Sequence, residues 1–373
     1  MNNKNKTSKS IDQLAKDNSS SLNINAGKEK PTGISGDNLK YIINKKRKKY
    51  TLSEYTDGIL KGDRVVLGRA LTLIESKIKE DNILSNKIID KSLPYSGKSI
   101  RIGITGIPGV GKSTFIEAFG LYLLDKSKKV AVMAVDPSSN LSRGSLMGDK
   151  TRMEKLSSNP DVFIRPSATS GFLGGVNRAT REAIILCEAA GYDIIIIETV
   201  GVGQSEVLVH SMVDFFLLLQ IAGAGDELQG IKKGIVEMAD AIAVSKSDGD
   251  NILKAKLCKQ ELENATHYSL NYDPDWQIPI TTISSQDNIG IDKVWETIQK
   301  HNDIMSKNGK FEEKRKLQLN QWLQTTISQT LENSFYNDIK VMEEFKKIKK
   351  DVIRKTISPI VAAEKLIKIF IKE

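Results

Sequence analysis

The sequence contains few of the residues that build disulfide frameworks and metal cages. Among 373 residues there are two cysteines, Cys187 and Cys258, and three histidines. The cysteines do not form a Cys-x-x-Cys pair, and the histidines do not cluster with them. We therefore exclude a small disulfide scaffold and a dedicated transition-metal site.

Long apolar runs are also missing. The longest, around Ile194–Ile197 and Phe215–Ala222, are far shorter than the roughly 20 residues that cross a bilayer. The sequence is polar from Met1 onward and has no apolar segment of the kind that directs secretion. We therefore expect a cytoplasmic protein with no membrane partner.

Acidic residues are scarce in the first fifty positions, and this accounts for most of the net charge. Residues 1–50 carry twelve Lys and Arg against four acids, a net charge of +8, while the whole chain carries +9. This segment is rich in Asn, Ser and Lys and cannot bury enough apolar surface to offset the entropy of ordering. We interpret it as a solvated, disordered tail, so the charge does not predict a nucleic-acid partner.

Further along the chain, short apolar runs alternate with longer amphipathic segments, a pattern typical of βαβ units. Runs such as Ile194–Ile197 are apolar on both faces, as a sheet covered by helices on both sides requires. We predict an α/β fold with a mostly parallel central sheet. The expected strands are Ile100–Thr105, Val130–Val135, Val162–Arg165, Tyr192–Glu198, Phe215–Ile221, Ala241–Ser245 and Ile280–Ile283.

Helical periodicity precedes this region and returns after it, from about Phe311. We therefore predict four parts: a basic tail over 1–50, a helical segment over 51–98, a nucleotide-binding domain over 99–305 and a helical arm over 306–373. Periodicity alone leaves open whether the arm covers its own domain or a second subunit.

The strongest chemical signal is the segment Gly106-Ile107-Pro108-Gly109-Val110-Gly111-Lys112-Ser113, between an expected strand and an expected helix. This is a complete P-loop in its required context. Its glycines let successive backbone N–H groups face phosphate oxygens, and the helix N-terminus adds its positive end. Lys112 should reach the β- and γ-phosphates, and the Ser113 hydroxyl should contact Mg²⁺. The fold is therefore predicted to be that of a P-loop NTPase.

Acidic residues near the strand ends are candidates for a Mg²⁺ site. Glu198 and Asp136 each lie at the carboxyl end of an expected strand, where ligands of open α/β sheets bind. Asp149 is a further candidate, or alternatively a helix cap. Gly201, just after Glu198, can offer its backbone N–H to the γ-phosphate, so the following segment is a candidate switch.

Base selection is predicted from Ser245-Lys246-Ser247-Asp248, at the end of another strand. Guanine-binding P-loop proteins use Asn-Lys-x-Asp here. The Asp accepts from the guanine N1–H and 2-amino groups, a donor pair that adenine lacks, and the Lys stem packs along the base. The later Ser284-Ser285-Gln286 fits the loop whose backbone N–H contacts the guanine oxygen. We therefore favour GTP over ATP.

Together these segments resemble the methylmalonyl-CoA mutase-associated GTPases, the MeaB/ArgK/MMAA group. The resemblance runs from about Tyr50 to at least Lys300 and includes GITGIPGVGKST, AVDPSS, GSLMGDKTRM, ETVGVGQSE and AGAGDELQGIKKG. It implies a GTPase chaperone that binds an adenosylcobalamin-dependent acyl-CoA mutase, gates cofactor loading and protects the enzyme. It also implies GTP/GDP and Mg²⁺ as cofactors and a homodimer built with the C-terminal arm.

The motifs and the resemblance together identify the expected site residues. The resemblance marks Asp226, Gln229 and Lys232 as a third switch that moves when the mutase is bound and contributes to stimulated hydrolysis. Residues expected to carry hydrolysis are Lys112, Asp136, Asp149, Glu198, Gln229 and Lys232, and those expected at the metal are Ser113, Asp136, Asp149 and Glu198. Residues expected to bind the nucleotide are Gly106, Gly109, Val110, Gly111, Lys112, Ser113, Thr114, Gly201, Lys246, Asp248, Ser284, Ser285 and Gln286.

Two departures from the family pattern lie on the guanine side. Ser245 replaces an Asn, and Ile283-Ser284-Ser285 replaces a Cys-Ser-Ala segment. Ser has one short hydroxyl, whereas Asn offers a donor and an acceptor together. We expect GTP to remain preferred over ATP, with weakened affinity for guanine.

Other functions would use the same P-loop. One is a kinase that acts on a transport system for basic amino acids, although no separate acceptor-binding base is evident. Another is a metal-delivery GTPase, which would need the clustered ligands that this sequence does not supply. A third is a binding module whose nucleotide is only structural. GTP turnover measured with and without a cobalamin-dependent mutase would separate these hypotheses.

Overall fold

The chain forms a seven-stranded sheet in which each neighbouring pair of strands is parallel. The computed structural model describes residues 50–76, 78–135, 153–165, 173–199, 205–222, 233–267 and 275–371. The spatial order is β3-β2-β4-β1-β5-β6-β7. The strands are β1 (Ile100–Gly106), β2 (Val130–Val135), β3 (Val162–Arg165), β4 (Ile194–Thr199), β5 (Phe215–Ile221), β6 (Ala241–Ser245) and β7 (Ile280–Thr282). The predicted α/β fold with a parallel sheet is confirmed.

Strand β1 lies between β4 and β5, with Ile102 opposite Ile196 on one side and Phe215 on the other. From β1 the chain places β2, β3 and β4 on one side of the sheet and β5, β6 and β7 on the other. This reversal creates a topological switch point, and ligands of open α/β sheets bind at the carboxyl ends of the strands there. The sheet therefore positions a binding site beyond the ends of β1, β4 and β5.

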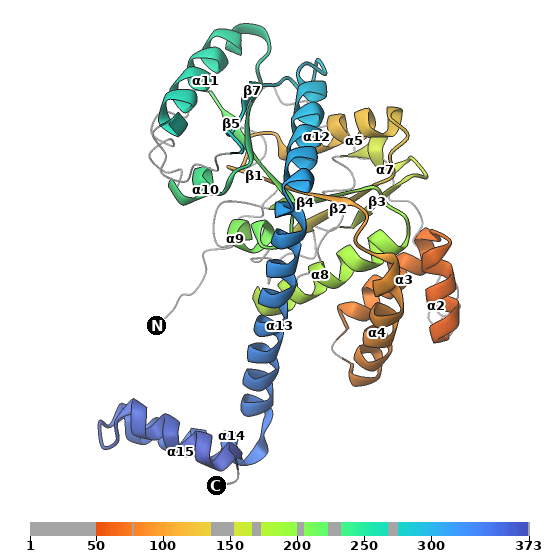
Figure 1. Ribbon diagram of the computed structural model, residues 1–373. Helices are drawn as coiled ribbons and strands as arrows, with labels where there is room; N and C mark the ends of the chain where they lie inside the picture. The colour runs from red at the N-terminus through yellow and green to blue at the C-terminus, as the bar shows by residue number, and fades with distance from the viewer. Residues whose placement is uncertain are drawn as a thin grey trace, which may run out of the picture. The chain divides into compact units, whose positions relative to one another are not determined.

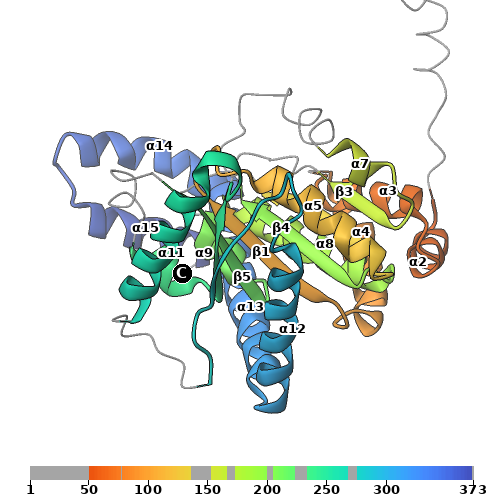
Figure 2. The ribbon, with the colours of Figure 1, turned by 90° about the horizontal axis from the view of Figure 1, so that it is seen from above.

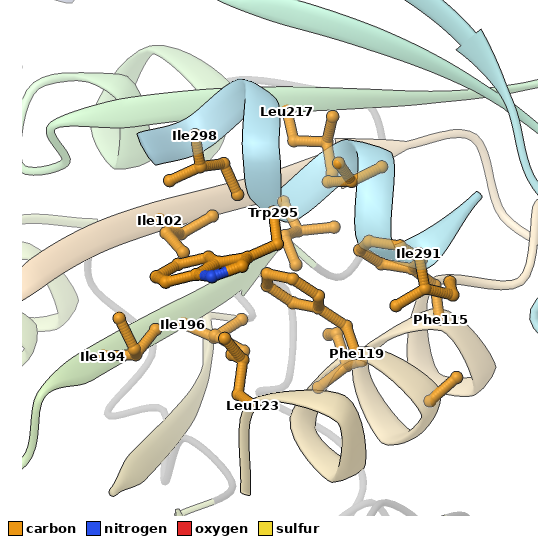
Figure 3. Packing of buried hydrophobic residues seen from close by; sticks show 14 of the residues in the cluster. Ile102, Phe115, Phe119, Leu123, Ile194, Ile196, Leu217, Ile291, Trp295 and Ile298 are labelled. Carbon is orange, nitrogen blue, oxygen red and sulfur yellow. The ribbon is translucent and has the colours of Figure 1, made fainter. Parts of the chain in front are cut away.

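One face of the sheet is covered by α5 (Lys112–Asp125) and α12 (Ile291–Lys307). Figure 3 shows Trp295 of α12 inserted beside Phe119 of α5, over Ile102 and Ile196 of the sheet. The two ring centroids lie 6.3 Å apart. Truncating a buried aromatic side chain to alanine costs about 3–5 kcal/mol. This cluster therefore holds the helix that follows the P-loop firmly against the strands.

Helices from distant parts of the chain cover the opposite face (Figure 1). Leu67 and Leu71 of α3 share a buried cluster with Ile197 of β4 and Phe216 of β5. The side chain of Asp63 caps α3 by accepting from two backbone N–H groups in its first turn. The helices in this layer are α2 (Leu52–Leu60), α3 (Arg64–Ile74), α4 (Lys79–Ser92), α8 (Leu173–Ala189) and α9 (Ser205–His210), while α10 (Lys233–Met238) and α11 (Ile252–His267) pack near β6 and β7.

The C-terminal region is helical, with α13 (Lys310–Asn337), α14 (Ile339–Ile353) and α15 (Pro359–Ile371). Gly309, with φ of 74°, directly precedes α13 and lets the chain turn from α12 into it. Figure 2 shows α14 and α15 side by side, and they share a small apolar cluster of their own. Within the described ranges, no helix has the length and apolarity needed to cross a bilayer.

A buried ion pair fastens the start of α13 to the amino ends of the strands. Arg315 pairs through two nitrogens with both carboxylate oxygens of Asp214, at 2.9 and 2.8 Å, and donates to the Ser99 carbonyl at 2.7 Å. One turn further on, Gln318 Nε2 donates to the Val213 carbonyl at 2.8 Å. The Arg315 and Asp214 side chains are only 10% and 4% exposed, so water cannot solvate either charge if the other is removed.

Replacing Arg315 with alanine should strongly destabilise the fold. The variant leaves the Asp214 carboxylate buried without its guanidinium, a loss of about 3–5 kcal/mol in the free energy of unfolding. Urea unfolding followed by circular dichroism measures it. As a matched control, Lys347→Ala removes a 3.2 Å pair with Glu344 whose lysine is 74% exposed, and should change the same quantity by less than about 1 kcal/mol. Similar losses in both variants would contradict the anchoring role of Arg315.

Candidate functional site

The loop between β1 and α5 has a backbone that glycine adopts most easily. Gly109 and Gly111 lie in the left-handed region, with φ of 80° and 100°. At Gly106 there is no space for a side chain, because an added Cβ would lie 2.6 Å from the Leu219 carbonyl oxygen. The glycines therefore let the loop curl tightly against the end of β5, as a phosphate-binding loop requires.

Lys112 is the first residue of α5 and folds back over the loop. Its ammonium donates to the carbonyls of Gly106 at 2.8 Å and Ile107 at 3.2 Å, and the residue is 8% exposed. Burial lowers the pKa of this ammonium, and the nearby carboxylates of Glu198 and Glu206 oppose that effect. The cation is thus held inside the loop by neutral carbonyls, where an anionic phosphate would be a stronger partner.

Ser113 and Glu198 are brought together from two neighbouring elements. The Ser113 hydroxyl donates to Glu198 Oε1 at 3.3 Å. Glu198 is 6% exposed, and the hydroxyl of the next residue, Thr199, donates to the Thr105 hydroxyl at 2.8 Å. This second bond joins the carboxyl ends of β4 and β1. A serine hydroxyl beside a carboxylate is the type of oxygen donor set that Mg²⁺ prefers.

Glu206 is the residue near the P-loop that the sequence analysis did not assign. It lies in the first turn of α9 and is fully buried, and its charge acts on Lys112. In the sequence Glu206 follows the polar residues Gln204 and Ser205, so nothing local indicates that it is buried. Its burial arises from the packing of α9 against the sheet, which periodicity over six residues cannot reveal.

Part of the predicted site lies outside the described residues. Strand β2 ends at Val135, one position before the predicted metal residue Asp136, and β5 ends at Ile221, shortly before the predicted third switch. Both elements therefore lead into segments that contain predicted site residues. The predicted residues outside the described ranges are Asp136, Asp149, Gly201, Asp226, Gln229 and Lys232, and their roles stay predictions.

A pocket opens between the P-loop and the carboxyl ends of β6 and β7. Asn251 Nδ2 donates to the Lys246 carbonyl at 2.8 Å, and Lys246 has a left-handed φ of 55°. A Cβ added at Gly111 would lie 4.0 Å from Lys246 Cε, so the lysine stem passes close to the loop. Residues lining the pocket are Val110, Gly111, Thr114, Ser245, Lys246, Asp248, Ser285 and Gln286.

Asp248 and Ser284 meet at one side of this pocket. The Ser284 hydroxyl, which is fully buried, is 2.8 Å from Asp248 Oδ2 and 3.1 Å from Asp287 Oδ2. Backbone bonds in both directions between Ser284 and Ile289 close the loop. Ser284 therefore bonds to Asp248, which lines the pocket together with the two residues after Ser284. Ser284 itself is fully buried and is not among the residues that line the pocket, and its predicted nucleotide contact stays a prediction.

The glycine loop between the first strand and a helix, with this pocket beside it, defines a P-loop nucleoside triphosphatase. A family model extends the assignment, because "Methylmalonyl Co-A mutase-associated GTPase MeaB" matches residues 67–340. The chain belongs to this family. It is a GTPase, and binding of guanine nucleotides follows from that class. The predicted resemblance is confirmed.

Individual relatives agree with the family. The chain is 45% identical to the GTPase ArgK of Escherichia coli over 289 residues, which cover 77% of this chain and 87% of that protein. It is 41% identical over 338 residues to the mouse protein named methylmalonic aciduria type A homolog, mitochondrial, with coverage of 88% and 81%. A solved structure described as an LAO/AO transport system kinase has a TM-score of 0.69 and 36% identity, and the match covers 88% of this chain and 99% of that one.

Lys112→Ala should abolish productive nucleotide binding. A triphosphate in the loop would lose the buried ammonium, a loss of about 2–5 kcal/mol or roughly thirty- to several-thousand-fold in affinity. Titration with a fluorescent GDP analogue and release of phosphate from GTP measure it. Lys126→Ala, at the exposed far end of the same helix, is the matched control and should behave like the parent. Unchanged hydrolysis by folded Lys112→Ala protein would refute the assignment of the site.

Proposed function

We propose that this GTPase is a chaperone of an adenosylcobalamin-dependent acyl-CoA mutase, which it binds in order to gate cofactor loading and to protect the enzyme. The observation that carries the proposal is the match to a family described as mutase-associated over residues 67–340. The name of the mouse relative, which refers to methylmalonic aciduria, is consistent with it. The structure supports the nucleotide-dependent part of this role.

Hydrolysis is assigned to the residues around the P-loop. Lys112 would exchange its loop carbonyls for β- and γ-phosphate oxygens, and backbone N–H groups of the loop would hold the same phosphates. Ser113 and Glu198, with their side chains 3.3 Å apart, would hold Mg²⁺ together with Asp136 and Asp149. When bound, Mg²⁺ neutralises charge that develops on the phosphate oxygens.

Guanine recognition is assigned to the pocket beside the loop. The Asp248 carboxylate would accept from the guanine N1–H and 2-amino groups, while the Lys246 stem packs against the base. The backbone of Ser285 and Gln286, which line the pocket, would contact the guanine oxygen. The bond from Ser284 to Asp248 at 2.8 Å would keep the carboxylate in place before the base arrives.

The third switch is assigned to Gln229 and Lys232, between the ends of two described elements. The strand before them, β5, ends at Ile221 beside the P-loop, and α10 begins at Lys233. A segment between these points starts at the edge where nucleotide binds. We infer that mutase binding moves it toward the phosphates, where a lysine would stabilise charge in the transition state.

The C-terminal arm is assigned to a homodimer. Four large aliphatic side chains recur every four residues on α13, a spacing that gathers them on one side of the helix. Each is about half exposed or more, which is unfavourable for an apolar stripe in water. A second copy of the chain would cover it. These residues are Leu319 (57%), Leu323 (59%), Ile327 (49%) and Leu331 (57%).

A transporter kinase is the alternative suggested by the description of one solved relative. The two functions differ in where the γ-phosphate goes: to water in a GTPase and to a protein side chain in a kinase. Recovery of inorganic phosphate, with none transferred to protein, distinguishes them. For metal delivery, no three His, Cys, Asp or Glu side chains in the described part of the chain gather into a group that could hold a metal ion.

Turnover of GTP should be slow for the protein alone and faster with methylmalonyl-CoA mutase present. In Lys232→Ala the acceleration should fall by about a hundredfold, the typical cost of losing one donor to transition-state charge, while GDP still binds. Lys256→Ala, an exposed lysine on α11, should retain the parent's response. Phosphate release with and without the mutase measures both. Equal stimulation of Lys232→Ala and the parent would rule out the switch, and a parent that does not respond would rule out the chaperone role with that enzyme.

The assigned dimer should dissociate when charge enters the α13 stripe. Leu323→Asp combined with Ile327→Asp places two carboxylates where a second copy would pack, and each buried leucine or isoleucine lost removes about 1.5–3 kcal/mol. Sedimentation velocity should then report a monomer. Leu253→Asp combined with Leu257→Asp, the same change in charge at two residues of α11 that are 73% and 61% exposed, should leave the dimer intact. A parent protein that sediments as a monomer would contradict the assignment.

A further inference from the structure

The side chain of Ser245 is placed differently from what its position in the guanine motif suggests. Ser245 ends β6 and is 3% exposed. Its hydroxyl lies 2.6 Å from the carbonyl oxygen of Val110 in the P-loop and 3.0 Å from the carbonyl oxygen of Gln220 near the end of β5. It therefore joins three segments at the carboxyl edge of the sheet.

The chemistry of these contacts determines where the hydroxyl proton goes. A carbonyl oxygen can only accept, so Ser245 must be the donor in both contacts. A hydroxyl has one proton, and the Val110 carbonyl is the nearer of the two acceptors. The proton is therefore directed mainly at the P-loop, and it is not available to a base in the pocket that Ser245 lines.

Holding the Val110 carbonyl has a direct consequence for the next N–H group. In a trans peptide the C=O and the following N–H point in opposite directions, and the described chain contains no cis peptide. A Val110 carbonyl turned toward Ser245 thus turns the Gly111 N–H away from β6. Backbone N–H groups of this loop are the ones that cradle phosphate.

The P-loop packs closely against the end of β5, the strand that the Ser245 hydroxyl also contacts. The Val110 side chain is fully buried, and a Cβ added at Gly106 would meet Val110 Cγ1 at 3.0 Å as well as the Leu219 carbonyl. The Ser245 hydroxyl binds the carbonyl of Gln220, the residue after Leu219. The peptide unit of Leu219 therefore lies against Gly106, at the start of the loop, while that of Gln220 holds the Ser245 hydroxyl that contacts Val110.

We propose that Ser245 is a positioning residue for the P-loop: its hydroxyl holds the Val110 carbonyl so that the Gly111 N–H faces bound phosphate, and it does not read the base. The proposal rests on the nucleotide site described above. Ser284 provides the contrast, because its hydroxyl is equally buried but binds the Asp248 carboxylate, on the base side of the pocket. Ser245 should therefore affect phosphate binding, and Ser284 should affect recognition of the base.

Paired alanine substitutions test this difference. Dissociation constants for GDP, ADP and inorganic pyrophosphate are measured for the parent, Ser245→Ala and Ser284→Ala by displacement of a fluorescent GDP analogue. Ser245→Ala should weaken all three ligands by the same factor, about three- to tenfold for one hydrogen bond, and leave the ratio of GDP to ADP affinity unchanged. Ser284→Ala should weaken GDP alone and lower that ratio.

Several outcomes would overturn the proposal. A fall in the GDP to ADP ratio in Ser245→Ala, with pyrophosphate binding unchanged, would mean that the hydroxyl acts on the base. Unchanged affinity for every ligand would mean that it positions nothing. A parent that binds neither GDP nor pyrophosphate would instead refute the nucleotide site itself, so the two failures can be told apart.

A second pair of substitutions at Ser245 keeps the proposal testable if the alanine variant does not fold. Ser245→Thr and Ser245→Val add the same bulk at a 3% exposed position and differ only in the hydroxyl. The threonine variant should bind pyrophosphate three- to tenfold more tightly than the valine variant. Equal binding by the two would count against the proposal, whatever their thermal unfolding midpoints.

Discussion

Parallel pairing of β1 with β4 on one side and with β5 on the other is the constraint on which the site depends. Because all three strands run in the same direction, their carboxyl ends lie along one edge of the sheet. This places Glu198 of β4 beside Ser113 and places the end of β5 under the P-loop. A strand in the opposite direction would remove one of these contacts. The residues of the site are therefore brought together by the parallel order of the strands.

The carboxyl and amino edges of the sheet contact different parts of the molecule. At the carboxyl edge, the end of β5 contacts Gly106 and Ser245, which belong to the nucleotide side. At the amino edge, Asp214 comes directly before β5 and binds Arg315 of α13. Strand β5, which leads toward the predicted third switch, is therefore the strand to which the C-terminal arm is bound. The arm and the nucleotide site therefore contact opposite ends of the same strand.

Much of this could be predicted from the sequence because the relevant signals are local. Glycines at fixed spacing allow a loop whose backbone conformation other residues adopt less easily. A run such as Ile194–Ile197 implies a strand that is buried on both faces. The seven strands appear within two residues of their expected bounds. Lys246 and Asp248, which come from one short motif, likewise line a pocket beside the P-loop. In each case the pattern and the physical reason for it lie within a few residues.

The tertiary structure decided what depends on residues far apart in the chain. The sequence marked Ser245 as a weak substitute for Asn beside the base, but its hydroxyl bonds to a carbonyl 135 residues away in the P-loop. Glu206 became a buried neighbour of Lys112 only through the packing of α9, and Arg315 found Asp214 across 101 residues. The sequence by itself determined the fold class, the loop and the family, because these are written in short contiguous patterns. The partners of individual buried polar groups were decided by the fold, because a short side chain bonds only to what packing brings within about 3 Å of it.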